Sequence, residues 1–321
     1  MKKTLSAILA VSIIVLMLAG CTQNTPVTEK TDKLTIVTTV FPIYDWVKNI
    51  LGDADADVTM LLDTGVDLHS FQPTADDIIK ISACDMFIYV GGESDEWVDD
   101  ALKEKANPDT VIINLLDVLG ENAKTEETVE GMEAEEESGE GELEYDEHIW
   151  LSLKNAAVLA DAIKEALVKL DSANESKYSA NAQSYIASLN ALDGEYEKAV
   201  SGAKVKTLVF GDRFPFRYMT DDYGIAYFAA FAGCSAESEA SFETVAFLAS
   251  KVDELGLNCV MALEGTDHRL AETVVASTAN KTAAVLALDS MQSVTAADVE
   301  NGTTYLGIAE SNLAVLKQAL N

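Results

Sequence analysis

Short apolar runs divide the chain into two sets of four predicted strands. The runs are rich in valine, isoleucine and aromatic residues, which favour strands. The first set covers residues 34–40, 58–62, 86–90 and 111–114, and the second covers 207–210, 225–231, 259–263 and 283–288. Apolar residues between them, at 75–82 and 242–255 for example, have helical spacing. Strands that alternate with helices indicate an α/β fold, so we expect two similar lobes, each a mostly parallel four-stranded sheet flanked by helices.

A nearly continuous helical pattern separates the two sets of strands. One helix is predicted over residues 154–170 and a second over 175–200. The second would be about 39 Å long at 1.5 Å per residue, long enough to join two lobes as one rigid helix. We therefore expect an N-terminal lobe (34–174), a linking helix (175–202) and a C-terminal lobe (203–321).

The segment 121–147 differs from the rest of the chain because it holds thirteen acidic residues and one lysine. It has few large apolar side chains, so it cannot bury enough surface to order itself. We expect a mobile acidic loop that ends at His148. The alternative is a solvated insert with no role of its own.

The N-terminus has the features of a targeting signal. Lys2 and Lys3 precede an apolar run at 5–18, which is too short to span a membrane. The run ends in Leu-Ala-Gly-Cys at 18–21, which resembles the lipobox of bacterial lipoproteins; an ordinary signal peptide with an incidental cysteine is the alternative. We expect a signal peptide at 1–20, lipidation of Cys21, a tether at 21–33, and a mature protein anchored on the extracytoplasmic face of the cell membrane.

The formal charge of −32 argues against nucleic-acid binding and suits a protein that concentrates cations near itself. Besides Cys21, the chain has Cys84, Cys234 and Cys259. Three cysteines with no CxxC spacing do not make a disulfide scaffold. Cys259 lies in an apolar run and is expected to be buried, and a bridge between Cys234 and Cys259 stays open as an alternative.

Each of the three histidines stands beside acidic residues. His69 follows Asp67, His148 follows Asp146 and Glu147, and His268 follows Asp267. Imidazole is a common ligand for zinc, so this sparing use next to carboxylates indicates a metal site. A lone histidine beside a carboxylate is, however, more often a surface pair or a helix cap.

Several of these polar residues directly follow predicted strands. Asp212 follows the first strand of the second set, Glu264 the third and Asp289 the fourth, while His69 follows the second strand of the first set. Ligands of open α/β sheets bind outside the carboxyl ends of the strands. We therefore expect several of these groups to converge in a cleft between the lobes.

Five motifs in order along the chain resemble the zinc/manganese solute-binding lipoproteins of metal-uptake ABC transporters, the cluster A-I family. They are VFPIYD at 40–45, DLHSFQPT at 67–74, DEHIW at 146–150, DDYG at 221–224 and GTTYL at 302–306. The resemblance implies two α/β lobes joined by a long helix, with one divalent metal between them. It also implies a monomer that delivers the metal to a membrane permease.

The resemblance also implies a set of ligands. His69 and His148 match the first two histidines of the family, Asp212 stands where the third ligand is usually His or Glu, and Asp289 matches the final carboxylate. Asp212 could instead form an ion pair with one of the neighbouring arginines. Glu264 and His268 are reserve ligands, and Glu264 is better suited to orient a ligand by hydrogen bonding.

The expected ligand set of two imidazoles and two carboxylates favours Zn²⁺ but also suits Mn²⁺, so a manganese-specific binding protein of the same type is an alternative. A surface adhesin, a label that some relatives carry, is another and would need an exposed apolar patch. No enzyme is expected, because the chain has no HExxH or GxSxG motif and a closed four-ligand site would be inert.

Overall fold

The computed structural model describes residues 33–103, 105–133, 144–235 and 239–321. The predicted signal peptide, Cys21 and nearly all of the tether lie outside these residues, as does 134–143 within the acidic segment. Residues 35–321 form one compact unit. In the part of the chain that is described, no helix is both long and apolar enough to cross a membrane.

The first half of the compact unit is built on a four-stranded sheet, as predicted. Its strands are β1 (Leu34–Thr38), β2 (Ala56–Met60), β3 (Met86–Tyr89) and β4 (Val111–Asn114), in the order β2-β1-β3-β4. β3 pairs in parallel with both β1 and β4. The helices of this half are α2 (Phe41–Leu51), α3 (Ala75–Ala83), α4 (Trp97–Ala101) and α5 (Leu115–Leu119).

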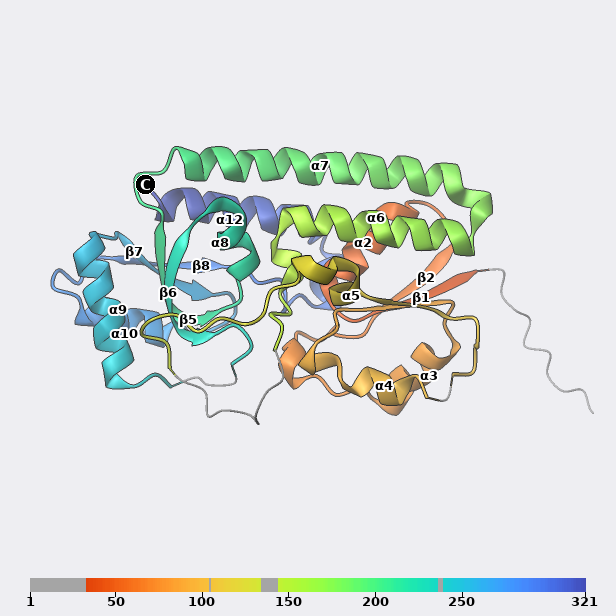
Figure 1. Ribbon diagram of the computed structural model, residues 1–321, viewed down its shortest axis with the longest axis horizontal. Helices are drawn as coiled ribbons and strands as arrows, with labels where there is room; N and C mark the ends of the chain where they lie inside the picture. The colour runs from red at the N-terminus through yellow and green to blue at the C-terminus, as the bar shows by residue number, and fades with distance from the viewer. Residues whose placement is uncertain (1–32, 104, 134–143, 236–238) are drawn as a thin grey trace, which may run out of the picture. The chain divides into compact units, whose positions relative to one another are not determined.

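The second half repeats this arrangement with a parallel sheet in the order β6-β5-β7-β8 (Figure 1). The strands are β5 (Thr207–Phe214), β6 (Ala226–Ala232), β7 (Cys259–Leu263) and β8 (Ala284–Leu288). Its helices are α8 (Arg217–Tyr223), α9 (Phe242–Leu255), α10 (Arg269–Ser277), α11 (Ala296–Glu300) and α12 (Tyr305–Ala319). Val260 and Ala262 of β7 are fully buried in one core with Leu248 of α9 and Val274 of α10, which explains the unbroken apolar run of this central strand.

β5 is longer than the sequence predicts and contains a register shift between Phe210 and Arg213. Gly211 lies at this shift, where an added Cβ would come within 2.5 Å of the Ala271 Cα on α10. The prediction that Asp212 follows the end of its strand is therefore wrong. Asp212 lies within β5, because the shift lets the strand continue to Phe214.

A pair of long helices joins the two halves. α6 (Leu153–Leu170) is followed by the short turn η5 (Ser172–Asn174) and by the 27-residue helix α7 (Glu175–Ser201). In Figure 1, α7 runs along α6 and α12. Tyr185 of α7 donates a hydrogen bond to Asp45 of α2 (2.9 Å), and Tyr196 donates one to the Ala309 carbonyl of α12 (2.6 Å). The predicted long helix is thus bonded to helices of both halves.

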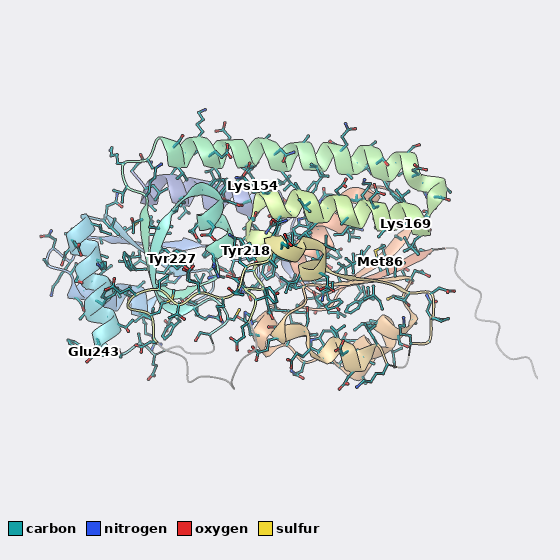
Figure 2. All side chains as sticks on the ribbon, viewed as in Figure 1. Met86, Lys154, Lys169, Tyr218, Tyr227 and Glu243 are labelled. Carbon is teal, nitrogen blue, oxygen red and sulfur yellow. The ribbon has the colours of Figure 1, made fainter. Side chains whose placement is uncertain are left out.

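The two described parts of the acidic segment are held in place, so the expectation of a mobile loop is wrong for them. Glu126 N donates to the Glu144 carbonyl (2.8 Å), and Glu133 N donates to the Ala230 carbonyl of β6 (2.9 Å). The hydroxyl of Tyr218 on α8, labelled in Figure 2, accepts a hydrogen bond from Lys124 N (2.8 Å). These partners lie far away in the sequence, and composition alone does not reveal them.

Candidate metal site

His69 is presented by the short 3-10 turn η1 (Leu68–Ser70). Asp67 caps this turn, and its Oδ1 accepts a hydrogen bond from His69 N at 3.0 Å. Leu68 is 1% exposed and anchors the turn in the core. Thr74 then caps α3 with a reciprocal pair of bonds to Asp77. The DLHSFQPT motif therefore contains the capping residues that fix the backbone of the turn that carries His69.

His148 is fixed by its own neighbours and is fully buried. Asp146 Oδ1 accepts hydrogen bonds from both the backbone N and the ring Nδ1 of His148, each at 2.9 Å. The next turn, η4 (Ile149–Leu151), is buried in the core, where the Trp150 indole donates to the Ser290 carbonyl at 2.8 Å. A carboxylate on Nδ1 leaves Nε2 of His148 to act as the ligand atom.

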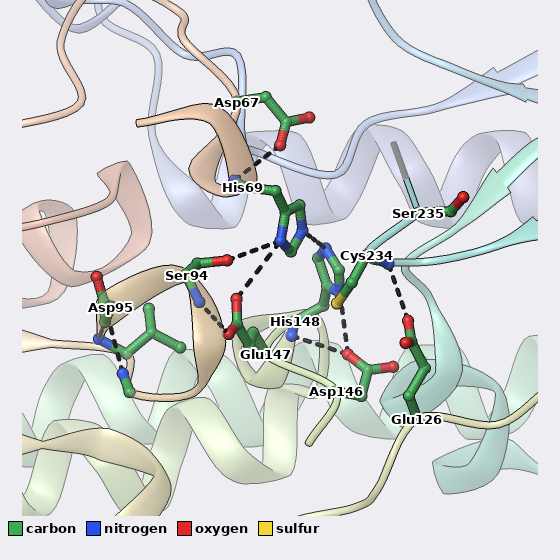
Figure 3. A network of polar contacts seen from close by, with 12 residues as sticks. Asp67, His69, Ser94, Asp95, Glu126, Asp146, Glu147, His148, Cys234 and Ser235 are labelled. Atoms are coloured by element: carbon green, nitrogen blue, oxygen red, sulfur yellow. Dashed lines mark hydrogen bonds and ion pairs between the residues drawn. The ribbon is translucent and has the colours of Figure 1, made fainter. Parts of the chain in front are cut away.

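The two histidines face each other across the site (Figure 3). Their Nε2 atoms are 3.4 Å apart. Two nitrogens bound tetrahedrally to zinc at 2.0–2.1 Å stand about 3.4 Å apart, so the pair has the spacing that this ion requires. His69 Nδ1 lies 2.7 Å from the Ser94 hydroxyl of the turn η2 (Glu93–Asp95), which leaves its Nε2 directed at the partner ring.

Cys234 is the third member of the group. Ligand atoms of His69, His148 and Cys234 all lie within 4.8 Å of one another, and no other such group of His, Cys, Asp and Glu occurs among the described residues. Cys84, Cys234 and Cys259 are all free, so the alternative of a Cys234–Cys259 bridge is wrong. Cys234 was not predicted from the sequence as a candidate ligand, and the one signal there is its place just after the predicted strand 225–231.

The predicted carboxylate ligands are not gathered at the histidine pair. Asp212 Oδ2 accepts hydrogen bonds from Leu263 N and the Thr266 hydroxyl, both at 3.1 Å. Asp289 Oδ1 accepts one from Met291 N at 2.7 Å. Their assignment as ligands stays a prediction, and these bonds do not favour it.

The remaining candidates also have other partners. Glu264 accepts bonds from Ser290 N (2.8 Å) and the Ser290 hydroxyl (2.6 Å). Nε2 of His268 lies 3.0 Å from the Leu263 carbonyl, and the residue caps α10 in a left-handed conformation. Arg213, one of the arginines that neighbour Asp212, pairs with Asp67 at 2.8 Å.

Burial controls the protonation of the groups around the pair. Burial, followed by the nearby His148 ring, lowers the pKa of His69, so its imidazole is neutral near pH 7 and offers a lone pair. Burial raises the pKa of Glu147, whose Oε2 lies 3.6 Å from His69 Nδ1, to about 7. Burial and then the Glu126 carboxylate raise the pKa of the Cys234 thiol, so it keeps its proton until a metal displaces it.

An acidic cleft of about 400 Å³ leads to the site. His69 and Cys234 lie in its wall. Five glutamates also line it, namely Glu93, Glu96, Glu126, Glu144 and Glu147. Carboxylates that line a cleft raise the local concentration of cations. The cleft therefore attracts cations, and its wall holds one imidazole and one thiol of the candidate metal site.

Curated relatives of this chain are named as zinc-binding proteins. The zinc-binding lipoprotein AdcA of Streptococcus pneumoniae is 31% identical over 98% of this chain and 61% of its own length. The high-affinity zinc uptake system protein ZnuA of Bacillus subtilis is 29% identical over 100% of this chain and 99% of its own. The chain thus spans only 56% to 61% of the length of the streptococcal relatives.

Solved structures and a family profile agree with these relatives. The Zn(II)-bound ZnuA-like domain of Streptococcus pneumoniae AdcA superposes with a TM-score of 0.70 at 28% identity, over 90% of this chain and 99% of that one. The profile described as zinc-uptake complex component A, periplasmic, matches residues 36–319. The chain therefore belongs to this family of solute-binding transport proteins, which are not enzymes.

Proposed function

We propose that this protein captures Zn²⁺ outside the cytoplasm and passes it to the permease of an ABC transporter. The ion is held by Nε2 of His69, in the turn η1 after β2, and by Nε2 of His148, directly before η4 and α6. The observation that carries this proposal is the 3.4 Å separation of these atoms, with each Nδ1 hydrogen-bonded elsewhere. The names of two relatives, a zinc-binding lipoprotein and a high-affinity zinc uptake protein, support the choice of ion.

The acidic cleft supports capture from a dilute solution. Its glutamates attract a divalent cation without competing strongly for zinc, because zinc prefers nitrogen and sulfur ligands. Desolvation of His69 keeps that ring neutral, so zinc does not have to displace a proton there. The order of events is then attraction by carboxylates, followed by transfer to the partly exposed imidazole of His69 and the buried imidazole of His148.

Anchoring at the membrane belongs to the same proposal. Cys21 follows an apolar run and would carry the lipid, and residues 22–33 would link it to the compact unit. A pneumococcal relative is named a lipoprotein, which supports this arrangement. The protein would act as a monomer on the extracytoplasmic face of the cell membrane.

Manganese remains the alternative ion of the proposal, with Asp212 and Asp289 as its oxygen ligands. Both carboxylates have hydrogen-bond partners of their own, so we place zinc first. Asp212→Asn and Asp289→Asn should leave zinc affinity within about twofold if the histidine pair is the site, because both carboxylates are held by hydrogen bonds of their own. A large loss in either variant would restore the carboxylate as a ligand.

A zinc titration of the full chain tests the proposed function. His69→Ala and His148→Ala should each weaken zinc binding at least about 100-fold, the upper range for groups that only orient a ligand. His268→Ala is the matched control, because its ring bonds to the Leu263 carbonyl, and it should bind zinc as the wild type does. Undiminished binding by both site variants would contradict the proposal.

A further inference from the structure

Cys234 is positioned at the histidine pair by the chain around it. It follows β6 after a single residue, Gly233. A Cβ at Gly233 would lie 2.9 Å from the Phe214 carbonyl oxygen and 3.2 Å from Cε1 of His148. Only glycine lets the backbone approach the imidazole this closely. The next residue, Cys234, is therefore placed beside the His148 ring.

A second contact fixes the backbone of Cys234. Its N–H donates a hydrogen bond to Glu126 Oε1 at 2.9 Å, so the acidic segment holds the loop after β6 from the other side (Figure 3). Glu126 and Cys234 also line the same cleft. The thiol thus lies in the wall of the acidic cleft, together with His69.

The other two described cysteines have a different setting. Cys84 is 2% exposed and donates a hydrogen bond to the Ile81 carbonyl of α3. Cys259 is 4% exposed in β7, next to the Met261 sulfur. Both behave as small apolar core residues. Of the three, only Cys234 lines the acidic cleft and stands within reach of two imidazoles.

We infer that the Cys234 thiolate is the third zinc ligand, and that it makes this chain select zinc and other thiophilic ions over manganese. The inference rests on the zinc capture proposed above. Binding forms a sulfur–zinc bond and releases the thiol proton to solvent. A tetrahedral site with zinc–nitrogen bonds near 2.0 Å and a zinc–sulfur bond near 2.3 Å needs nitrogen–sulfur spacings of about 3.6 Å. The ligand atoms of the group lie within 4.8 Å of one another, so each nitrogen–sulfur spacing would shorten by about 1.2 Å at most to reach this geometry.

The selectivity follows from ligand softness. Thiolates favour zinc and related ions, whereas manganese prefers carboxylate, carbonyl and water oxygens. Replacing the sulfur ligand with an oxygen ligand should therefore lower the zinc affinity and also change the ratio of zinc affinity to manganese affinity. Cys234→Asp should lower the zinc-to-manganese affinity ratio by at least about tenfold.

Cobalt absorption tests the sulfur ligand directly. The Co²⁺ complex of the full chain should show a thiolate-to-cobalt charge-transfer band in the near ultraviolet. Cys234→Ser should lose this band, whereas Cys21→Ala, Cys84→Ala and Cys259→Ala should each keep it. Cys234→His, which supplies a nitrogen ligand, should bind cobalt without the band and shows that loss of the band does not come from misfolding.

Two results separate this inference from the proposed function. A band that persists in Cys234→Ser, or is absent from the wild type, would overturn the sulfur ligand while the histidine variants still lose zinc. Normal zinc binding by His69→Ala and His148→Ala would overturn the proposed site and the inference with it.

Discussion

Asp146 controls the orientation of His148, and its removal should weaken zinc binding without unfolding the protein. The carboxylate is 3% exposed, and one oxygen accepts both the backbone N–H and the ring Nδ1–H of the histidine. Asp146→Asn keeps the size of the side chain and one acceptor oxygen. It removes the negative charge that stabilises the imidazole when Nε2 donates its lone pair to the metal.

The expected size of the effect follows from these contacts. A hydrogen bond to a charged group contributes about 1.5–3 kcal/mol, and only the Nδ1–H bond bears directly on metal affinity. At about 1.4 kcal/mol per tenfold change, this predicts a loss of roughly 10- to 100-fold, the usual range for groups that orient a metal ligand. The partial retention of the bond by asparagine places the expected value near the lower end.

Competition with a fluorescent zinc chelator at pH 7 measures this change. Asp193→Asn is a matched control, because Asp193 Oδ1 accepts a bond from the Tyr223 hydroxyl (2.8 Å) and contacts neither histidine. The control should match the wild type. If Asp146→Asn also bound zinc within twofold of wild type while its urea unfolding midpoint was unchanged, the carboxylate would have no orienting role and the reasoning would be refuted.

Two further predictions concern stability. Burial, and then the Asp289 charge, raise the pKa of Glu264 from its ordinary 4.5 to about 7. Between these values the folded chain holds a proton that the unfolded chain lacks, so the contribution of Glu264 to stability is most favourable below pH 4.5, falls as the pH rises from 4.5 to 7, and is constant above 7. The full shift is worth about 3 kcal/mol. The side chain is only half-buried, so solvent screening reduces this value. We expect Glu264→Gln to be more stable than the wild type by about 1–2 kcal/mol at pH 8 and as stable as the wild type at pH 4. Equal stability of the two proteins at both pH values would contradict the raised pKa. Thr74→Ala removes the reciprocal cap of α3 and should lower the free energy of unfolding in urea by about 1 kcal/mol. An unchanged free energy of unfolding would show that this cap does not stabilise the protein.

The fold was largely predictable because buried strands require runs of apolar residues, which can be recognised in the sequence. The strands of both sheets are short apolar runs, and seven of the eight run close to their predicted ends. β5 is the exception, since its register shift depends on Gly211 meeting Ala271 of α10. No local pattern encodes a contact between residues so far apart.

The candidate site was only partly predictable. His69 and His148 were predicted from motifs in which the residues that fix them, Asp67 and Asp146, stand two positions earlier in the sequence. Cys234 carries no motif, and its role depends on the close approach of Gly233 to the His148 ring. The placement of such a residue needs the tertiary structure.

The prediction that the acidic segment is mobile was wrong for its described parts for a related reason. Composition predicts that it stays unfolded when it is considered alone. In the structure its first part bonds to β6 and α8, where Ala230 and Tyr218 supply the partners. A segment with little apolar surface can be ordered by hydrogen bonds to a surface that is already folded.

The most direct test of the account is a crystal structure of the zinc-loaded chain with anomalous data at the zinc edge. We predict one strong anomalous peak about 2.0–2.1 Å from Nε2 of His69 and of His148, and near 2.3 Å from Sγ of Cys234. A peak at Asp212 or Asp289 that is remote from the histidine pair would contradict the account.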